Sequence, residues 1–304
     1  MTPVRLFILC LCLMSVASLA QEINANKLLR LRDSLDNILV VNPSASAILA
    51  KHKEVEFFSF SGLSQNSQHF DKQGNAVSFS GKQMLFNSLL QINYGLSKNR
   101  RVNIGIDLNY RAYRFSSDIG ESSFSVFDAS GTQALTYAGL RLRTQPFKRL
   151  KTFNYQTNLW FPIANPDAQL ALSAHKVNWG HTFFFYKYLN TRVGLFTQAN
   201  LTFAIPGSNS GVQEKTELYV PVNISLSYVV NPKNIFFTSG VYSWITTDIS
   251  KTMEGGDSDF TQVVIGYQRV VTKKFFLMLN YNTTLTSRNY GKWSGLNAGL
   301  RLLY

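Results

Sequence analysis

From about residue 83 onward, apolar and polar residues alternate one by one along the chain, over runs of a dozen residues or more. In one such run, Ile104 and Ile106 share one face while Asn103 and Asp107 share the other. Successive side chains of a β-strand point to opposite faces, so the pattern predicts long strands with one apolar and one polar face. A soluble sandwich can alternate in this way, but it rarely does so over such lengths with aromatic residues at the ends of the apolar face.

Twelve segments show this pattern, and the connections between them alternate between short turns and longer loops rich in Gly, Ser and Asp. Short turns at one end and long loops at the other are typical of barrels that span a bacterial outer membrane. Lipid favours closure, because an open sheet edge in hydrocarbon leaves backbone groups without hydrogen bonds. We therefore predict an all-β fold, a transmembrane antiparallel up-and-down β-barrel of about 12 strands. Ten or fourteen strands are alternatives, because the predicted loop at 62–82 could hide another hairpin. The twelve segments are roughly 53–61, 83–97, 101–115, 132–144, 151–163, 170–188, 191–205, 215–230, 234–248, 259–271, 274–287 and 292–304.

The composition fits a chain whose residues face two environments. Charged residues make up 15% of the chain, against roughly 25% in soluble domains, and aromatic residues make up 13%. Mean hydropathy is −0.05. A bundle of membrane helices needs repeated runs of about 20 apolar residues and is excluded.

The first 20 residues have the pattern of an export signal peptide. Arg5 precedes an apolar stretch that is shorter than a typical membrane-spanning helix. Ser18 and Ala20 are the small residues expected before a cleavage site. Both cysteines, Cys10 and Cys12, lie inside this stretch. Cleavage would leave a chain without cysteine, which excludes disulfides and thiol chemistry.

Residues 21–50 differ from the barrel region, 51–304. Apolar residues at three- and four-residue spacing predict a short helix over 26–40, and Asn42-Pro43 ends it. Such a segment either plugs the barrel lumen or forms a periplasmic cap.

The Asn42-Pro43 dipeptide, followed by small residues, is similar to the N-terminal hatch of outer-membrane transporters for fatty acids and hydrophobic compounds. Those transporters usually have Asn-Pro-Ala, whereas this chain has Ser44, and they usually have more strands. The resemblance implies a plug, and Asp33 and Asp36 are the acidic residues of the helix that could hold it to the lumen wall.

The last residue, Tyr304, lies on the apolar face of the last predicted strand, with Leu302 and Leu300 behind it. In this the chain resembles the outer-membrane β-barrel proteins of Gram-negative bacteria, which typically end in an aromatic residue on such a strand. The resemblance implies that Tyr304 is an assembly signal for the barrel-assembly machinery. It also implies that outer-membrane lipids and lipopolysaccharide surround the protein.

The four histidines are His52, His69, His175 and His181, and none has the spacing of a metal site with a carboxylate partner. The segment 175–181 is the nearest candidate for a catalytic site, but it has no suitably flanked serine. The basic residues are not clustered in a nucleic-acid-binding module. We expect no enzymatic activity, no metal, no other cofactor and no nucleic-acid partner.

Four arginines share the polar, inward parity of their strands, because a charge that faces lipid near mid-membrane costs roughly 2–4 kcal/mol. They give the lumen a positive field that favours anionic solutes, or they pair with acidic residues and brace the wall. Both interpretations remain open. The arginines are Arg111, Arg141, Arg143 and Arg301, and the possible partners in the wall are Asp107 and Glu217.

The favoured function is a passive channel or narrow transporter for small polar, anionic or amphiphilic solutes in the bacterial outer membrane. The alternatives are a structural or interaction barrel with a filled lumen and, less favoured, a barrel lipid hydrolase. The short turns are rich in Lys and Arg and are expected to face the periplasm.

Overall fold

The computed structural model describes residues 49–98, 101–147, 149–150, 152–207, 215–246 and 257–304. Within these residues, no helix has the length and apolar character needed to cross a membrane. Several predicted features lie outside the described residues: the signal peptide, the helix at 26–40, and the plug candidates Asp33, Asp36, Asn42 and Pro43.

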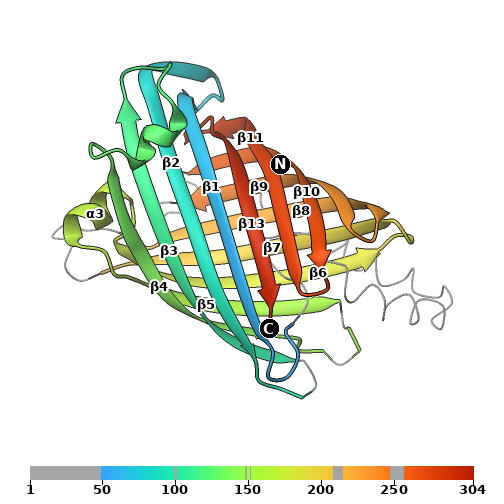
Figure 1. Ribbon diagram of the computed structural model, residues 1–304. Helices are drawn as coiled ribbons and strands as arrows, with labels where there is room; N and C mark the ends of the chain where they lie inside the picture. The colour runs from blue at the N-terminus through green and yellow to red at the C-terminus, as the bar shows by residue number, and fades with distance from the viewer. Residues whose placement is uncertain (1–48, 99–100, 148, 151, 208–214, 247–256) are drawn as a thin grey trace. The chain divides into compact units, whose positions relative to one another are not determined.

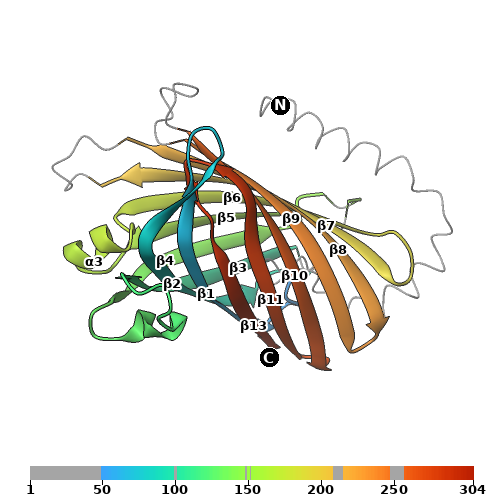
Figure 2. The same cartoon turned by 90° about the horizontal axis from the view of Figure 1, so that it is seen from above.

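The described residues form one antiparallel sheet that closes into a barrel (Figures 1 and 2). Each long strand pairs with its neighbours in sequence, and closure comes from β1, which pairs with both β2 and β13. The predicted twelve-stranded barrel is confirmed, because β12 has only two residues, which pair with the end of β1. The strands are β1 (Val55–Phe70), β2 (Ala76–Gly95), β3 (Val102–Ser116), β4 (Thr132–Thr144), β5 (Phe153–Pro162), β6 (Lys176–Tyr188), β7 (Val193–Pro206), β8 (Glu217–Asn231), β9 (Asn234–Thr246), β10 (Ser258–Thr272), β11 (Phe275–Arg288), β12 (Tyr290–Gly291) and β13 (Ser294–Leu303).

The two faces of the strands have the predicted polarity. On β3, Ile106 is 49% exposed whereas its neighbour Asp107 is 2% exposed, and on β4 Leu140 is 63% exposed whereas Arg141 is 4% exposed. On these two strands, apolar side chains therefore lie on the outside and polar side chains on the inside. This arrangement is favourable only where lipid replaces water around the barrel.

The connections also have the predicted asymmetry. At one end, the short-turn end, most strands are joined by brief connections, and at the other, the long-loop end, most are joined by longer ones. Two of the longer ones contain helices, η1 (Ser123–Phe127) and α3 (Pro166–Ala171). The short-turn connections are 96–101, 145–152, 189–192, 232–233 and 273–274.

The predicted loop at 62–82 is wrong, since most of it is strand. β1 and β2 stay paired as far as Phe70 and Ala76, and a tight turn joins them. In that turn, Asp71 Oδ1 accepts hydrogen bonds from the backbone N–H groups of Gln73 (2.9 Å) and Asn75 (2.8 Å). The extended hairpin is polar on both faces over 64–68, so no alternation reveals it. Its backbone pairing alone makes it a strand.

The predicted strand at 170–188 begins too early. Its first residues belong to α3 and the turn after it, and β6 begins at Lys176. Asn165 caps the helix, because its Oδ1 accepts a hydrogen bond from Ala168 N at 2.8 Å, and Pro166 occupies the first helical position.

Candidate functional site

Arg141 and Asp107 form a buried ion pair inside the barrel. They project from the adjacent strands β4 and β3, and Arg141 Nη2 lies 2.6 Å from Asp107 Oδ2. Trp160 on β5 donates from Nε1 to the same oxygen at 2.8 Å. The proposed pairing of a lumen arginine with Asp107 is thus present in the structure.

Arg143 and Arg301 share a partner that the sequence did not single out, Glu56 on β1. Arg301 Nε lies 2.5 Å from Glu56 Oε1, and Arg143 Nη1 lies 3.6 Å from Oε2. Asn93 also donates to Oε2, at 3.1 Å. Glu56 is fully buried. It faces inward together with the apolar Phe58, so this part of β1 has no apolar–polar alternation from which the position of Glu56 could be predicted.

We call Glu56, Asp107, Arg141, Arg143 and Arg301 the ion cluster. All five side chains are at least nine-tenths buried, and buried charges are tolerated only when paired. Three guanidinium groups face two carboxylates, so the cluster keeps an excess of positive charge. The ion pairs do not satisfy every polar atom of the cluster. Arg141 Nε and Nη1 and Asp107 Oδ1 are buried and make no hydrogen bond within the described residues.

Beside the ion cluster, the inner surface at the short-turn end is apolar. Arg143 lies over the ring of Phe184 at 5.9 Å and Arg301 over that of Phe276 at 5.6 Å, which places the two surfaces in contact. The apolar side chains come from β6, β7, β9 and β11, and we call them the apolar wall: Phe184, Phe196, Ile235, Phe237 and Phe276.

Arg111 lies apart from the ion cluster and holds the α3 loop. Its Nη1 donates to Leu172 O at 3.1 Å, and its guanidinium lies 5.5 Å from the centre of the Tyr137 ring. Leu172 and Ala168 pack against Tyr137 and the partly buried Trp160, both on the inner wall. The loop that carries α3 is therefore folded against the inside of β4 and β5 at the long-loop end (Figure 1).

The predicted pairing of the arginines with Glu217 is not what the structure shows. Glu217 Oε1 lies 2.8 Å from Lys176 Nζ, and Tyr219 donates to its Oε2 at 2.6 Å. Both partners are on β6 and β8 near the long-loop end, whereas three of the arginines are near the short-turn end. Alternation along a strand predicts which face a side chain occupies, but the register between strands decides which side chains are neighbours, and this is why the pairing differs.

Residues 49–54 lie between the inner face of β2 and the start of β1. A turn at 51–54, in which Glu54 N donates to Lys51 O at 3.0 Å and Lys53 has φ 64°, reverses its direction. The backbone before the turn then lies on the inner face of β2, because a Cβ on the buried Gly95 would be 1.8 Å from Lys51 O. Only glycine permits this approach.

Tyr304 completes the closure. Its N–H donates to Val55 O at 2.9 Å, and its carbonyl accepts from Val55 N at 3.0 Å, so the chain's last residue is bonded to the first residue of β1. The side chain is 86% exposed, on the outside of the barrel.

The histidines of the 175–181 segment do not converge on a site. His181 lies on the outer face of β6, where its Nδ1 is 2.7 Å from Tyr155 Oη and its ring packs edge-on against Trp179 at 4.5 Å. Within the described residues, no three His, Cys, Asp or Glu side chains come together as metal ligands.

No protein-family model matches the chain, and no curated protein matches it. Among solved structures, the fold is similar to that of an outer-membrane channel from Pseudomonas putida F1, with 14% identity, 86% of this chain and 98% of that chain covered, and a TM-score of 0.62. Two further similar structures are the NanC porin (6% identity, 81% and 98% covered, TM-score 0.46) and the β domain of the Bordetella autotransporter BrkA (14%, 83% and 100%, TM-score 0.49). The chain has the fold of an outer-membrane β-barrel protein.

Proposed function

We propose that the barrel is a passive channel for small anionic, polar or amphiphilic solutes. The observation that carries this proposal is the two-sided lumen at the short-turn end. The ion cluster has an excess of positive charge, and two nitrogens of Arg141 have no hydrogen-bond partner among the described residues. Two other members of the cluster, Arg143 and Arg301, lie against the apolar wall. A solute with an anionic or polar group and an apolar part finds a complementary surface for each.

The test is conductance in planar lipid bilayers. A channel gives discrete current steps, and under a salt gradient its reversal potential should show anion preference. Replacing Arg141, Arg143 and Arg301 by Gln together should shift that preference towards cations. Heat-modifiable gel mobility reports whether the variant barrel is folded. A folded barrel that never conducts, whether as wild type or without residues 21–50, would contradict the proposal.

The second candidate is a structural or interaction barrel with a filled lumen. Two observations favour it: the ion cluster is almost completely buried, and the α3 loop packs against the inner wall. Electrical silence of a well-folded barrel is the result that this candidate predicts.

The segment 21–50 is proposed to plug this lumen. The turn at 51–54 supports the proposal, because it places Ala50 and Lys51 against the inner face of β2. Asp33 and Asp36 are less suited to anchoring the plug than expected, since Glu56 and Asp107 already pair with the arginines at that end.

A further inference from the structure

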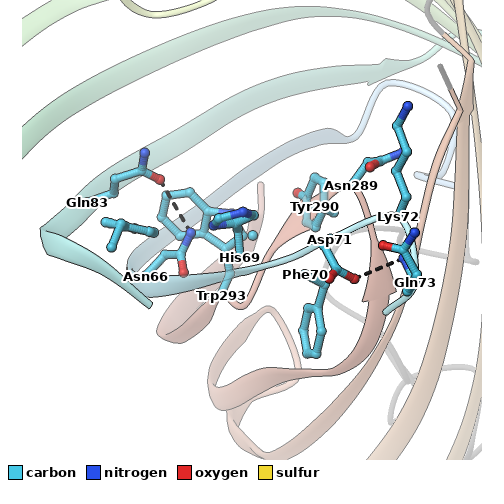
Figure 3. Close-up of a pocket in the computed structure, with 12 residues that line it drawn as sticks. Asn66, His69, Phe70, Asp71, Lys72, Gln73, Gln83, Asn289, Tyr290 and Trp293 are labelled. Atoms are coloured by element: carbon cyan, nitrogen blue, oxygen red, sulfur yellow. Dashed lines mark hydrogen bonds between the residues drawn. The ribbon is translucent and has the colours of Figure 1, made fainter. Parts of the chain in front are cut away.

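A pocket of about 660 Å³ lies at the long-loop end, between the β1–β2 hairpin and the residues around β12 (Figure 3). This volume is in the range of pockets that hold small-molecule ligands. The pocket brings together segments far apart in the sequence, because β12 pairs with the end of β1 through His69 and Gly291.

One side of the pocket is built around Gly291. A Cβ at this position would lie 2.4 Å from Asn66 Nδ2 and 2.5 Å from Trp293 Nε1, so glycine lets both side chains approach the backbone. Asn66 is held in place, since it donates to Gln83 Oε1 at 3.3 Å and accepts from Gln68 N at 3.0 Å. Gln83 uses its oxygen in this bond, and its NH2 group makes no hydrogen bond to the other described residues.

Aromatic rings form much of the remaining lining. His69 stacks on Phe79 with ring centres 6.4 Å apart, and Tyr290 stacks on Phe260 at 4.3 Å. His69, Phe79, Tyr290 and Trp293 line the pocket and give it flat ring faces beside the side-chain amides, whereas Phe260 supports Tyr290 from outside the lining. Stacking fixes their orientation before any ligand arrives.

The pocket has little net charge to offer a ligand. Among the described residues that line it, the one carboxylate is Asp71, which accepts hydrogen bonds within its own turn. Hydrogen bonds from the backbone and side chain of Asn75 and from the backbone of Gln73 hold the pKa of Asp71 below its ordinary value. Lys72, the next residue, is the one Lys or Arg among the described lining residues, so the lining has no net charge. What remains for recognition is aromatic surface and neutral amides.

We propose that this pocket binds a neutral saccharide. A sugar ring presents C–H faces that pack on aromatic rings and hydroxyl groups that both donate to and accept from amides. A purely apolar ligand would leave the NH2 group of Gln83 desolvated without a partner, and an anion would meet the Asp71 carboxylate as well as Lys72. The inference does not depend on conduction, because capture at the mouth does not require passage through the barrel.

Isothermal titration of the full-length protein tests this inference, in a detergent without sugar groups because glycoside detergents would compete. The probes are neutral di- and trisaccharides of glucose, galactose and mannose, with p-cresol as an aromatic comparison. We expect a saccharide to bind and Trp293→Ala and Gln83→Leu each to weaken binding at least about tenfold. Trp244→Ala is the matched control. This tryptophan lies on the outer face of β9, and its loss should change affinity less than about twofold.

Three results would overturn the inference: no saccharide binds, saccharide affinity is the same in all variants, or p-cresol binds at Trp293 while the sugars do not. Heat-modifiable mobility establishes that each variant is folded, and Gln83→Leu keeps the test valid if Trp293→Ala does not fold. A barrel that conducts but binds no sugar contradicts this inference alone. A silent barrel that binds sugar contradicts only the channel.

Discussion

At the residue scale, Glu56 links two members of the ion cluster, because its carboxylate faces both Arg143 and Arg301. Glu56→Gln keeps the volume but leaves Arg143 and Arg301 without their carboxylate partner in a buried site. Removing one partner of a buried pair costs about 3–5 kcal/mol. We expect the free energy of unfolding, measured by urea titration in phospholipid vesicles, to fall by an amount of this order.

Glu217→Gln is the matched control for this prediction. Glu217 also pairs with a cation, Lys176, but its side chain is 21% exposed and water compensates part of the loss. Its cost should be at most about 1 kcal/mol. Equal destabilisation by the two substitutions would show that the ion cluster does not stabilise the barrel in the way that its burial indicates.

At the scale of single elements, the turn at 51–54 and strand β2 hold Ala50 and Lys51 against the inner wall of the barrel. Gly95→Ala places a Cβ within 1.8 Å of Lys51 O and should push the chain before the turn off the inner face of β2. We expect limited proteolysis of the purified barrel to cut the segment 21–50 faster, and conductance to rise if that segment plugs the lumen.

Gly240→Ala on β9 provides the control, because a Cβ there meets no atom within 4 Å. It should leave both the proteolysis rate and the conductance unchanged. If Gly95→Ala behaves in the same way as Gly240→Ala, the plug proposal loses its structural support.

At the scale of the whole molecule, the barrel's orientation follows from the asymmetry of its two ends. Short turns of outer-membrane barrels face the periplasm, so the long-loop end should face outward. Cysteines placed at Ser130 and Asp257 should react with a membrane-impermeant maleimide on intact cells, whereas a cysteine at Lys233 should react only after lysis. The reverse labelling pattern would contradict this orientation.

Closure of the barrel should depend on the last residue. Tyr304→Asp puts a charge on the outward side of the strand that joins the two ends of the sheet, next to Val55. We expect the folded fraction in outer membranes, measured by heat-modifiable mobility, to fall several-fold, while Asp257→Asn in a loop leaves it unchanged. Equal folded yields would show that Tyr304 is not an assembly signal.

Some features of this structure can be predicted directly from the sequence. Alternation is a local property of each strand, so residues 101–115 alone show that Asp107 faces inward and Ile106 outward. The number of long strands and the asymmetry of the connections follow from counting such runs. The extension of the β1–β2 hairpin over 62–82 did not, because residues 64–68 are polar on both faces and only backbone pairing makes them a strand.

The identity of the partners inside the barrel was decided only by the tertiary structure. Glu56 and Arg143 lie on strands three positions apart, and their contact depends on the curvature of the closed wall. Likewise, the alternation along β8 predicted that Glu217 faces inward but did not give its depth in the barrel. The register of the strands places it beside Lys176 rather than beside the arginines. A repeat of two residues fixes the face of a side chain, whereas closure and register fix its depth and its neighbours.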